Sequence, residues 1–165
     1  MSIRIAGTGS YVPDRILTNA DLEKMVETSD EWIRTRTGIE ERHIAAPDQP
    51  TSDLAYHASL KALEMAGITG ADLDAIIVAT ITPDYVFPST GCVLQDRLGA
   101  KGAFCFDLEA ACSGLLYSLE VACALMKTHP NRYRHVLVIG AEKLSCITDW
   151  TNRNTCVLFG DGAGA

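Results

Sequence analysis

The spacing of apolar side chains between residues 51 and 66 predicts an amphipathic helix. Apolar residues recur there at intervals of three and four, which places them on one face of a helix with about 3.6 residues per turn. Gly67 follows at the position of a helix C-cap, where a residue without a Cβ tolerates the left-handed backbone. We therefore expect a surface helix whose inner face is formed by Leu54, Ala55, Ala58, Ala62 and Met65.

Other segments carry helical signals of two kinds. Thr18 and Ser29 each offer a side-chain oxygen to the amides of a first helical turn, acidic residues follow both, and Gly38 ends the second helix. Apolar spacing predicts two more helices, over 89–98 and 112–127. The helix over 112–127 is apolar almost all round, which is typical of a helix buried in a core.

Short apolar runs predict strands between these helices. Residues 75–81 form an unbroken run rich in β-branched side chains, which is typical of a strand covered on both faces, and residues 136–139 repeat the pattern. Residues 3–9 alternate like a short strand, and 39–45 form a charged extended segment. Further strands are predicted over 103–108 and 155–159.

The alternation of strands and helices predicts an α/β layered fold with a mostly parallel sheet. The last residues, 160–165, form a glycine-rich turn directly after a predicted strand, and no helix follows to complete the layer. We therefore expect the chain to be the first part of a longer fold. An apolar face left uncovered in this way predicts self-association or association with the missing part.

Composition and charge narrow the class of function. The chain has 165 residues, of which 47% are hydrophobic, and this is enough for a packed core. Its formal net charge of -7 argues against sequence-independent binding of nucleic acid. The six cysteines show no C-x-x-C pair and no spacing of metal ligands, which disfavours zinc, iron–sulfur and disulfide frameworks. Without an apolar run of about 18 residues, we expect a cytoplasmic protein with no membrane contact.

Cys112 is the candidate nucleophile. A predicted strand leads into the small residues Ala110 and Ala111, and a long helix is expected to begin at the cysteine. The backbone amides and the dipole at the start of a helix favour the thiolate and can also hold an oxyanion, which suits acyl capture from a thioester. The alternative interpretation is a small core cysteine, as for Cys123 and Cys156.

Eight segments of the chain, in order, resemble β-ketoacyl-acyl-carrier-protein synthase III. The segments are GTGSY at 7–11, NADL at 19–22, TSDEWI at 28–33, TRTGI at 35–39, ERHIA at 41–45, FPS at 87–89, AACSG at 110–114 and FGDGAGA at 159–165. Each motif is weak alone, but their joint order and spacing are specific. The resemblance covers residues 1–165 and implies the amino-terminal half of a thiolase-like fold, a five-stranded sheet with helices on both faces.

The resemblance implies that Cys112 accepts an acyl group and that a catalytic histidine and asparagine come from the absent carboxy-terminal half. The four histidines of this chain, His43, His57, His129 and His135, are interpreted as structural. The family would use acyl-coenzyme A and malonyl-acyl carrier protein as substrates in type II fatty acid synthesis, as a homodimer. No metal or redox cofactor is implied.

The resemblance also implies a site for coenzyme A. Trp32 and Arg153 would sandwich the adenine, Thr28 would hydrogen-bond to it, and Arg36 and Thr37 would lie near the phosphates. By pattern alone, the better interpretation is that Trp32 is a core-edge aromatic and Arg36 a solvated charge, and the family resemblance reverses this preference. A second tryptophan, at 150, lies where the chain departs most from the family pattern.

Three residues are assigned by the resemblance to the acyl pocket. Phe87 would cross a dimer interface to close the partner's pocket, and Leu144 and Phe159 would line the same pocket, which favours a short primer such as acetyl. A buried loop anchor is the alternative for Phe87. Two other functions also stay open: a related hydroxymethylglutaryl or polyketide-type synthase, and a non-catalytic acyl-coenzyme A binding domain.

Overall fold

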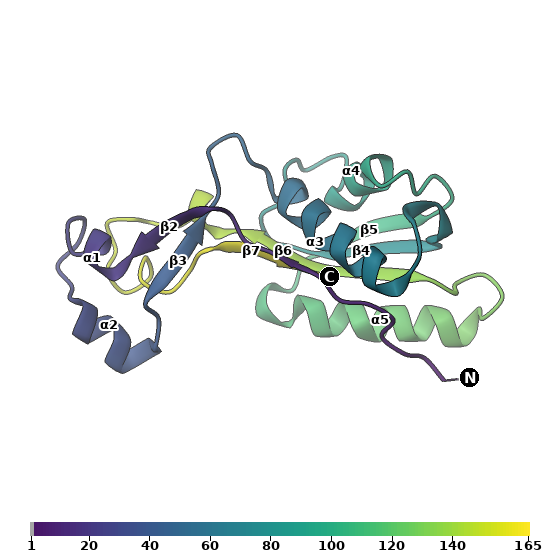
Figure 1. Cartoon of the computed structure of the whole chain (residues 1–165), viewed down its shortest axis with the longest axis horizontal. Helices are drawn as coiled ribbons and strands as arrows, with labels where there is room; N and C mark the ends of the chain where they lie inside the picture. The colour runs from purple at the N-terminus through teal and green to yellow at the C-terminus, as the bar shows by residue number, and fades with distance from the viewer. Residues whose placement is uncertain (1) are drawn as a thin grey trace.

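A five-stranded mixed sheet forms the larger part of the molecule in a computed structural model that describes residues 2–165 (Figure 1). Its strand order is β1-β7-β6-β4-β5. Strands β6, β4 and β5 are parallel, while β7 and β1 continue the sheet in antiparallel pairing. The strands are β1 (Ser10–Tyr11), β4 (Ala75–Ala79), β5 (Phe104–Leu108), β6 (Val136–Lys143) and β7 (Asp161–Gly164).

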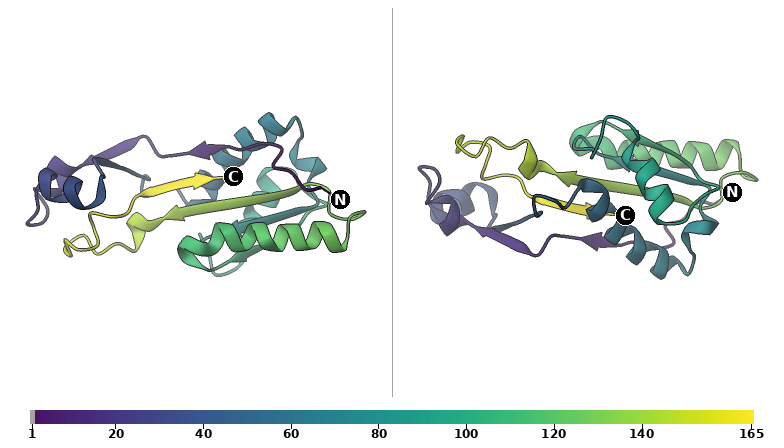
Figure 2. Two further views of the ribbon diagram at one scale, coloured as in Figure 1. Left: turned by 90° about the horizontal axis from the view of Figure 1, so that it is seen from below. Right: turned by 90° about the horizontal axis from the view of Figure 1, so that it is seen from above.

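Helices cover both faces of this sheet, as expected from the sequence. Helices α3 (Thr51–Ala66) and α4 (Thr90–Arg97) pack against each other on one face, and α5 (Gly114–Thr128) lies on the other (Figure 2). All five residues of β4 are buried, because this strand has a neighbour on each side and helices above and below. The α/β fold with a five-stranded sheet is therefore confirmed.

A smaller two-stranded sheet lies at one end of the molecule. Strands β2 (Arg15–Thr18) and β3 (Glu41–Ile44) pair in antiparallel fashion, and helices α1 (Asn19–Leu22) and α2 (Asp30–Thr37) connect them. This unit shares a second core with the segment 145–160, which returns from the large sheet. The buried residues of this second core are Leu17, Leu22, Ile33, Ile44, Cys156 and Val157.

The predicted helix boundaries are confirmed by hydrogen bonding at the caps. The Thr18 hydroxyl accepts a bond from the amide of Asp21, and the Ser29 hydroxyl accepts one from the amide of Trp32. Gly38 and Gly67 end their helices in the left-handed conformation, with φ of 73° and 69°. Short 3-10 turns occur at η1 (Gly70–Asp72), η2 (Ala111–Ser113) and η3 (Leu144–Cys146).

Two predicted strands are wrong. Residues 3–9 are not a strand: among the described residues, only Gly9 of this segment exchanges backbone hydrogen bonds with a neighbouring segment, at Ala165, and regular pairing begins with β1. Gly7 packs on α3, where a Cβ would lie only 2.2 Å from the carbonyl oxygen of Ala62. Residues 155–159 form turns, in which the amide of Leu158 donates to the carbonyl of Thr155, and the strand follows at 161–164 in place of the predicted turn. The apolar run there fills the second core instead of a sheet.

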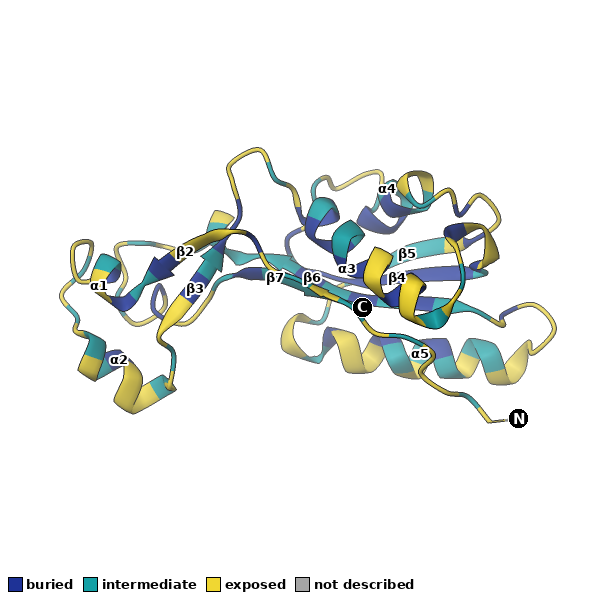
Figure 3. Ribbon diagram, viewed as in Figure 1, coloured by how far each residue is buried: buried dark blue, intermediate teal, exposed yellow. Residues whose placement is uncertain are grey.

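Helix α5 differs from the predicted buried helix. It rests on β4 and β6 through one face, on which Gly114, Ser118 and Ala122 are buried. The opposite face is open, and Leu116 is 67% exposed (Figure 3). Both faces of the helix carry apolar residues, which is why its sequence is apolar almost all round. The described residues cover only one of these two faces.

Arg42 connects the small sheet to the segment 145–160. Its buried guanidinium donates to the carbonyl oxygen of Val157, at 2.5 Å from Nη2 and 3.2 Å from Nε, and to the side-chain oxygen of Asn19. Asn19 in turn donates to Asp30 and to the carbonyl of Ile39. Burial lowers the pKa of Arg42 from its usual value. This network fixes the segment 145–160 against the small sheet.

We predict that Arg42→Met lowers the free energy of unfolding by about 1–3 kcal/mol, because it leaves the Val157 carbonyl and the Asn19 amide oxygen buried without a donor. Urea denaturation measures the change. Arg15→Met is the matched control, since Arg15 lies exposed on the same small sheet. Equal stability of the two variants would contradict the role given to Arg42.

Candidate active site

Cys112 lies in a tight turn between β5 and α5. The strand ends at Leu108, and the backbone reverses through Ala111, whose φ of 45° is unusual for a residue with a Cβ. Cys112 occupies the 3-10 turn η2 and is exposed, and α5 begins two residues later, at Gly114. The helix therefore begins after the cysteine instead of at it, although the thiol remains at the amino end of the helix.

Close packing beneath the turn sets the position of this thiol. A Cβ on Gly114 would lie 2.9 Å from the Cβ of Ala79, so α5 starts in direct contact with the end of β4. On the other side of β5, the carboxylate of Asp107 accepts bonds from the amides of Thr90 and Gly91, at 2.7 and 2.8 Å. The start of α4 is thereby tied to the strand that leads to Cys112.

Cys112 opens into a pocket of about 550 Å³. The predicted pocket residues Leu144 and Phe159 both line it, so the structure brings these three side chains together as the resemblance implied. Ile81 and Ile147 add apolar surface. The polar part of the wall comes from Glu142, Thr148, Asp149, Asn152 and Thr155.

Glu142 is a pocket residue that the sequence analysis did not identify. Its carboxylate accepts bonds from the amide of Ile81 at 2.9 Å and from the hydroxyls of Thr82 and Thr80 at 2.6 and 3.3 Å. These bonds hold the segment after β4 beside the Cys112 pocket. The predicted strand ended at residue 139, so the sequence pattern did not place Glu142 on β6. The available signal was an acidic residue three positions after an apolar strand.

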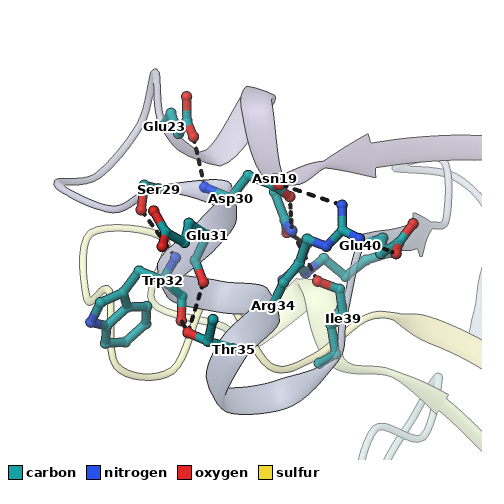
Figure 4. Close-up of polar contacts among 11 residues, drawn as sticks. Asn19, Glu23, Ser29, Asp30, Glu31, Trp32, Arg34, Thr35, Ile39 and Glu40 are labelled. Atoms are coloured by element: carbon teal, nitrogen blue, oxygen red, sulfur yellow. Dashed lines mark hydrogen bonds and ion pairs between the residues drawn. The ribbon is translucent and has the colours of Figure 1, made fainter.

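The side chains of Trp32, Arg36 and Arg153 lie together outside this pocket. The guanidinium carbons of Arg36 and Arg153 are 4.5 and 4.6 Å from the centre of the Trp32 ring. Trp32 projects from α2 away from the polar network around Asn19 (Figure 4). Two cations on one aromatic ring can attract a phosphorylated ligand that also has a flat ring.

The two predicted threonines have different environments. The Thr28 hydroxyl is buried and has no hydrogen-bond partner among the described residues, so it retains the capacity to bond to a ligand. The Thr37 hydroxyl is already engaged, because it donates to the carbonyl of Ile33 at 2.8 Å and accepts from the amide of Ile39 at 3.0 Å. Thr37 therefore stabilises the end of α2 in this structure.

Trp150 belongs to the second core. Its ring packs against that cluster, as Trp32 does, and its indole Nε1 donates to the carbonyl of Ser145 at 3.2 Å. Trp150 thus supports the segment that carries both Arg153 and the pocket residue Leu144.

Phe87 does not reach the Cys112 pocket of its own chain. It is 88% exposed and follows two further exposed residues, Tyr85 and Val86. A buried loop anchor, the alternative left open by the sequence, is therefore excluded.

The histidines lie away from the pocket. His43 and His135 place their Nδ1 atoms 2.6 and 3.0 Å from the carbonyl oxygens of Pro13 and Asp72. His57 lies 3.6 Å from the carboxylate of Asp53, and His129 packs its ring on that of Tyr133. None of them lines the pocket within the part of the chain that the structure describes. Over the same residues, no helix is long and apolar enough to cross a membrane.

The fold and the exposed thiol at a strand-to-helix turn define the class: a thiolase-like α/β protein with a cysteine-centred pocket. A family described as 3-oxoacyl-[acyl-carrier-protein (ACP)] synthase III matches residues 106–165. A β-ketoacyl-[acyl-carrier-protein] synthase III of Xanthomonas campestris is 62% identical over 98% of this chain and 49% of its own length. The crystal structure of 3-oxoacyl-[acyl-carrier-protein] synthase III from Aquifex aeolicus has a TM-score of 0.93 at 54% identity, over 97% of this chain and 51% of its own.

A third relative belongs to another pathway. The priming β-ketosynthase of the R1128 polyketide pathway has a TM-score of 0.93 at 38% identity, over 98% of this chain and 48% of its own. The chain spans about half the length of the curated relatives it matches. In sequence and fold it corresponds to the amino-terminal half of a β-ketoacyl-[acyl-carrier-protein] synthase III, which confirms the resemblance.

We predict that Glu142→Gln lowers the free energy of unfolding by about 1–3 kcal/mol, because the amide nitrogen cannot accept the bonds that the carboxylate receives around residue 81. Chemical denaturation provides the measurement. Glu120→Gln, on the exposed side of α5, is the control and should leave stability unchanged. A Glu142→Gln variant as stable as the unsubstituted chain would refute the anchoring role.

Proposed function

We propose that the protein to which this chain belongs is the initiating condensing enzyme of type II fatty acid synthesis. The thiolate of Cys112 attacks the carbonyl of an acyl-coenzyme A, and coenzyme A leaves as its thiol. Malonyl-acyl carrier protein then loses CO2, and the resulting carbanion attacks the acyl group on Cys112. The products are a 3-oxoacyl carrier protein and the free thiolate. The observation that carries this proposal is the exposed thiol at the mouth of a pocket.

The pocket supports a short primer. Beside the thiol, the apolar side chains of Leu144, Ile147 and Phe159 form a wall for the acyl group. The polar residues Asp149 and Asn152 line the same pocket. By resemblance to the family, we propose a short primer such as acetyl. Phe87 is proposed to close the equivalent pocket in the other subunit of a homodimer, which accounts for its exposure in a single chain.

The coenzyme A donor is proposed to bind over Trp32. Adenine would stack between Trp32 and Arg153, with Thr28 as its hydrogen-bond partner and Arg36 and Thr37 near the phosphates. In the structure, Arg153 lies 4.6 Å from the Trp32 ring. Two stacked layers, each about 3.5–4 Å thick, need more space than this. Adenine binding therefore requires Arg153 to move outward.

The remaining parts of the enzyme are proposed to come from the second half of the protein. A histidine and an asparagine there would polarise the thioester carbonyl and assist decarboxylation. The exposed face of α5, with Leu115, Leu116 and Tyr117, offers an apolar surface for that half. The chain alone is proposed to lack condensing activity, and the whole protein is proposed to act in the cytoplasm.

Two other functions are less well supported. Curated synthase III relatives are 58–62% identical to this chain, against 38% for the polyketide priming synthase, so a polyketide acceptor is less well supported. A non-catalytic acyl-coenzyme A binding domain has no need of an exposed thiol in its pocket.

We predict that acetyl-coenzyme A acetylates Cys112 and leaves Cys146 unmodified, although both thiols are exposed. Only Cys112 lines the pocket and lies at the amino end of α5. Peptide mapping by mass spectrometry locates the acetyl group. With malonyl-acyl carrier protein added, the chain alone should form no steady 3-oxoacyl product.

Cys112→Ser and Cys146→Ser are the matched variants for this experiment. Acetylation should be lost in the first and kept in the second. Equal acetylation of both cysteines would indicate that acetylation depends only on exposure of the thiol. Steady condensation by the chain alone would refute the proposed need for a second half.

We predict that Trp32→Ala weakens binding of coenzyme A roughly five-fold or more, because stacking of a base on an aromatic ring is worth about 1–3 kcal/mol. Titration calorimetry measures the dissociation constant. Trp32→Phe keeps an aromatic surface and should retain most of the affinity. The adenine site lies elsewhere if both variants bind as the unsubstituted chain does.

A further inference from the structure

A second pair of thiols lies outside the Cys112 pocket. Cys92 is on α4 and Cys105 is on β5, and their sulfur atoms are 3.4 Å apart. Both side chains are half-buried, so neither is sealed from small molecules. Neither residue lines the pocket or contributes to the proposed acyl transfer.

The two thiols have unequal surroundings. The hydroxyl of Ser89 donates a hydrogen bond to the sulfur of Cys92 at 3.2 Å. Cys105 is the opposite case, since burial, followed by its hydrogen bond with Cys92, raises the pKa of its thiol to about 12. Of the pair, Cys105 is thereby disfavoured as the attacking thiol, which leaves that role to Cys92.

We propose that Cys92 and Cys105 form a redox-reactive dithiol that a small hydroperoxide oxidises to a disulfide, separately from the catalytic thiol. In the first step the Cys92 thiolate attacks the peroxide oxygen, giving a sulfenic acid and releasing an alcohol or water. In the second, Cys105 displaces the sulfenic hydroxyl as water, losing its proton as the sulfur–sulfur bond forms. Both sulfurs are oxidised while the peroxide takes up two electrons.

The geometry supports the second step. A disulfide bond is about 2.05 Å long, so the sulfurs have to approach from 3.4 Å, a small movement for side chains already in contact. No other segment has to move between them, because α4 packs directly on β5.

Oxidation would act on the loop that precedes α4. Ser89 caps α4, and the exposed residues Tyr85, Val86 and Phe87 come directly before it. A bond from Cys92 to β5 would fix the base of this loop to the sheet that also leads to Cys112. Oxidation of the dithiol by a peroxide would therefore fix the base of the segment proposed for the dimer contact.

The test uses the chain with Cys112→Ser and Cys146→Ser, which removes the two exposed thiols and leaves four of the six cysteines. After treatment with hydrogen peroxide, the thiols counted in denaturant should fall from four to two and return to four with dithiothreitol. Peptide mapping should find residues 92 and 105 in one linked pair. A linked pair that involves another cysteine, or no loss of thiols, overturns the proposal.

Single substitutions in the same background test the order of the steps. With Cys105→Ser, peroxide should leave a sulfenic acid on Cys92 that dimedone traps, whereas with Cys92→Ser the thiol of Cys105 should stay reduced. Dimedone labelling of Cys105 in the second variant would refute the assigned roles. The disulfide-linked peptide is sought in the background chain, which carries neither Cys92→Ser nor Cys105→Ser. A single variant that fails to fold therefore leaves that test unaffected.

Discussion

The candidate active site depends on one close contact, between Gly114 at the start of α5 and Ala79 at the end of β4. A side chain at position 114 would clash with β4, so glycine is what allows the helix to begin so near the sheet. The chain between β5 and α5 must then turn sharply, and Ala111 adopts a positive φ to do so. Cys112 is at the surface because no space remains for it beneath the turn.

The segment 145–160 unites the two proposed binding regions. Leu144, directly before it, and Phe159, near its end, line the Cys112 pocket, while Arg153 in its middle lies on Trp32. Two buried charged side chains hold this segment. Arg42 binds the carbonyl of Val157, and Asp161 accepts bonds from the amide and the hydroxyl of Ser145 and from the amide of Ala45. The outward movement of Arg153 proposed for donor binding would therefore occur in a segment held beside the Cys112 pocket.

The open apolar face of α5 agrees with the finding that the chain spans about half the length of its curated relatives. A helix with apolar residues on every side needs two partners, and this chain supplies the sheet alone. The Cys112 thiol, the pocket beside it and the cluster of Trp32 with Arg36 and Arg153 all lie in this chain. The groups that would activate the bound thioester are proposed for the other half, so substrate capture and condensation would be divided between the halves of one fold.

The sequence by itself determined the local structure and the candidate nucleophile. Caps at Thr18, Ser29 and Gly67 fixed helix ends through bonds between near neighbours, and the apolar run of β4 required burial on both faces. The motif around Cys112 and its resemblance to a family identified the thiol. Contacts between distant segments were decided only by the tertiary structure. They include Glu142 with the end of β4, the contact of Arg153 with Trp32, and the strand at 161–164, whose glycines and alanine have no strand pattern of their own. Such pairings depend on how layers pack, and packing is not encoded in the spacing of residues along one segment.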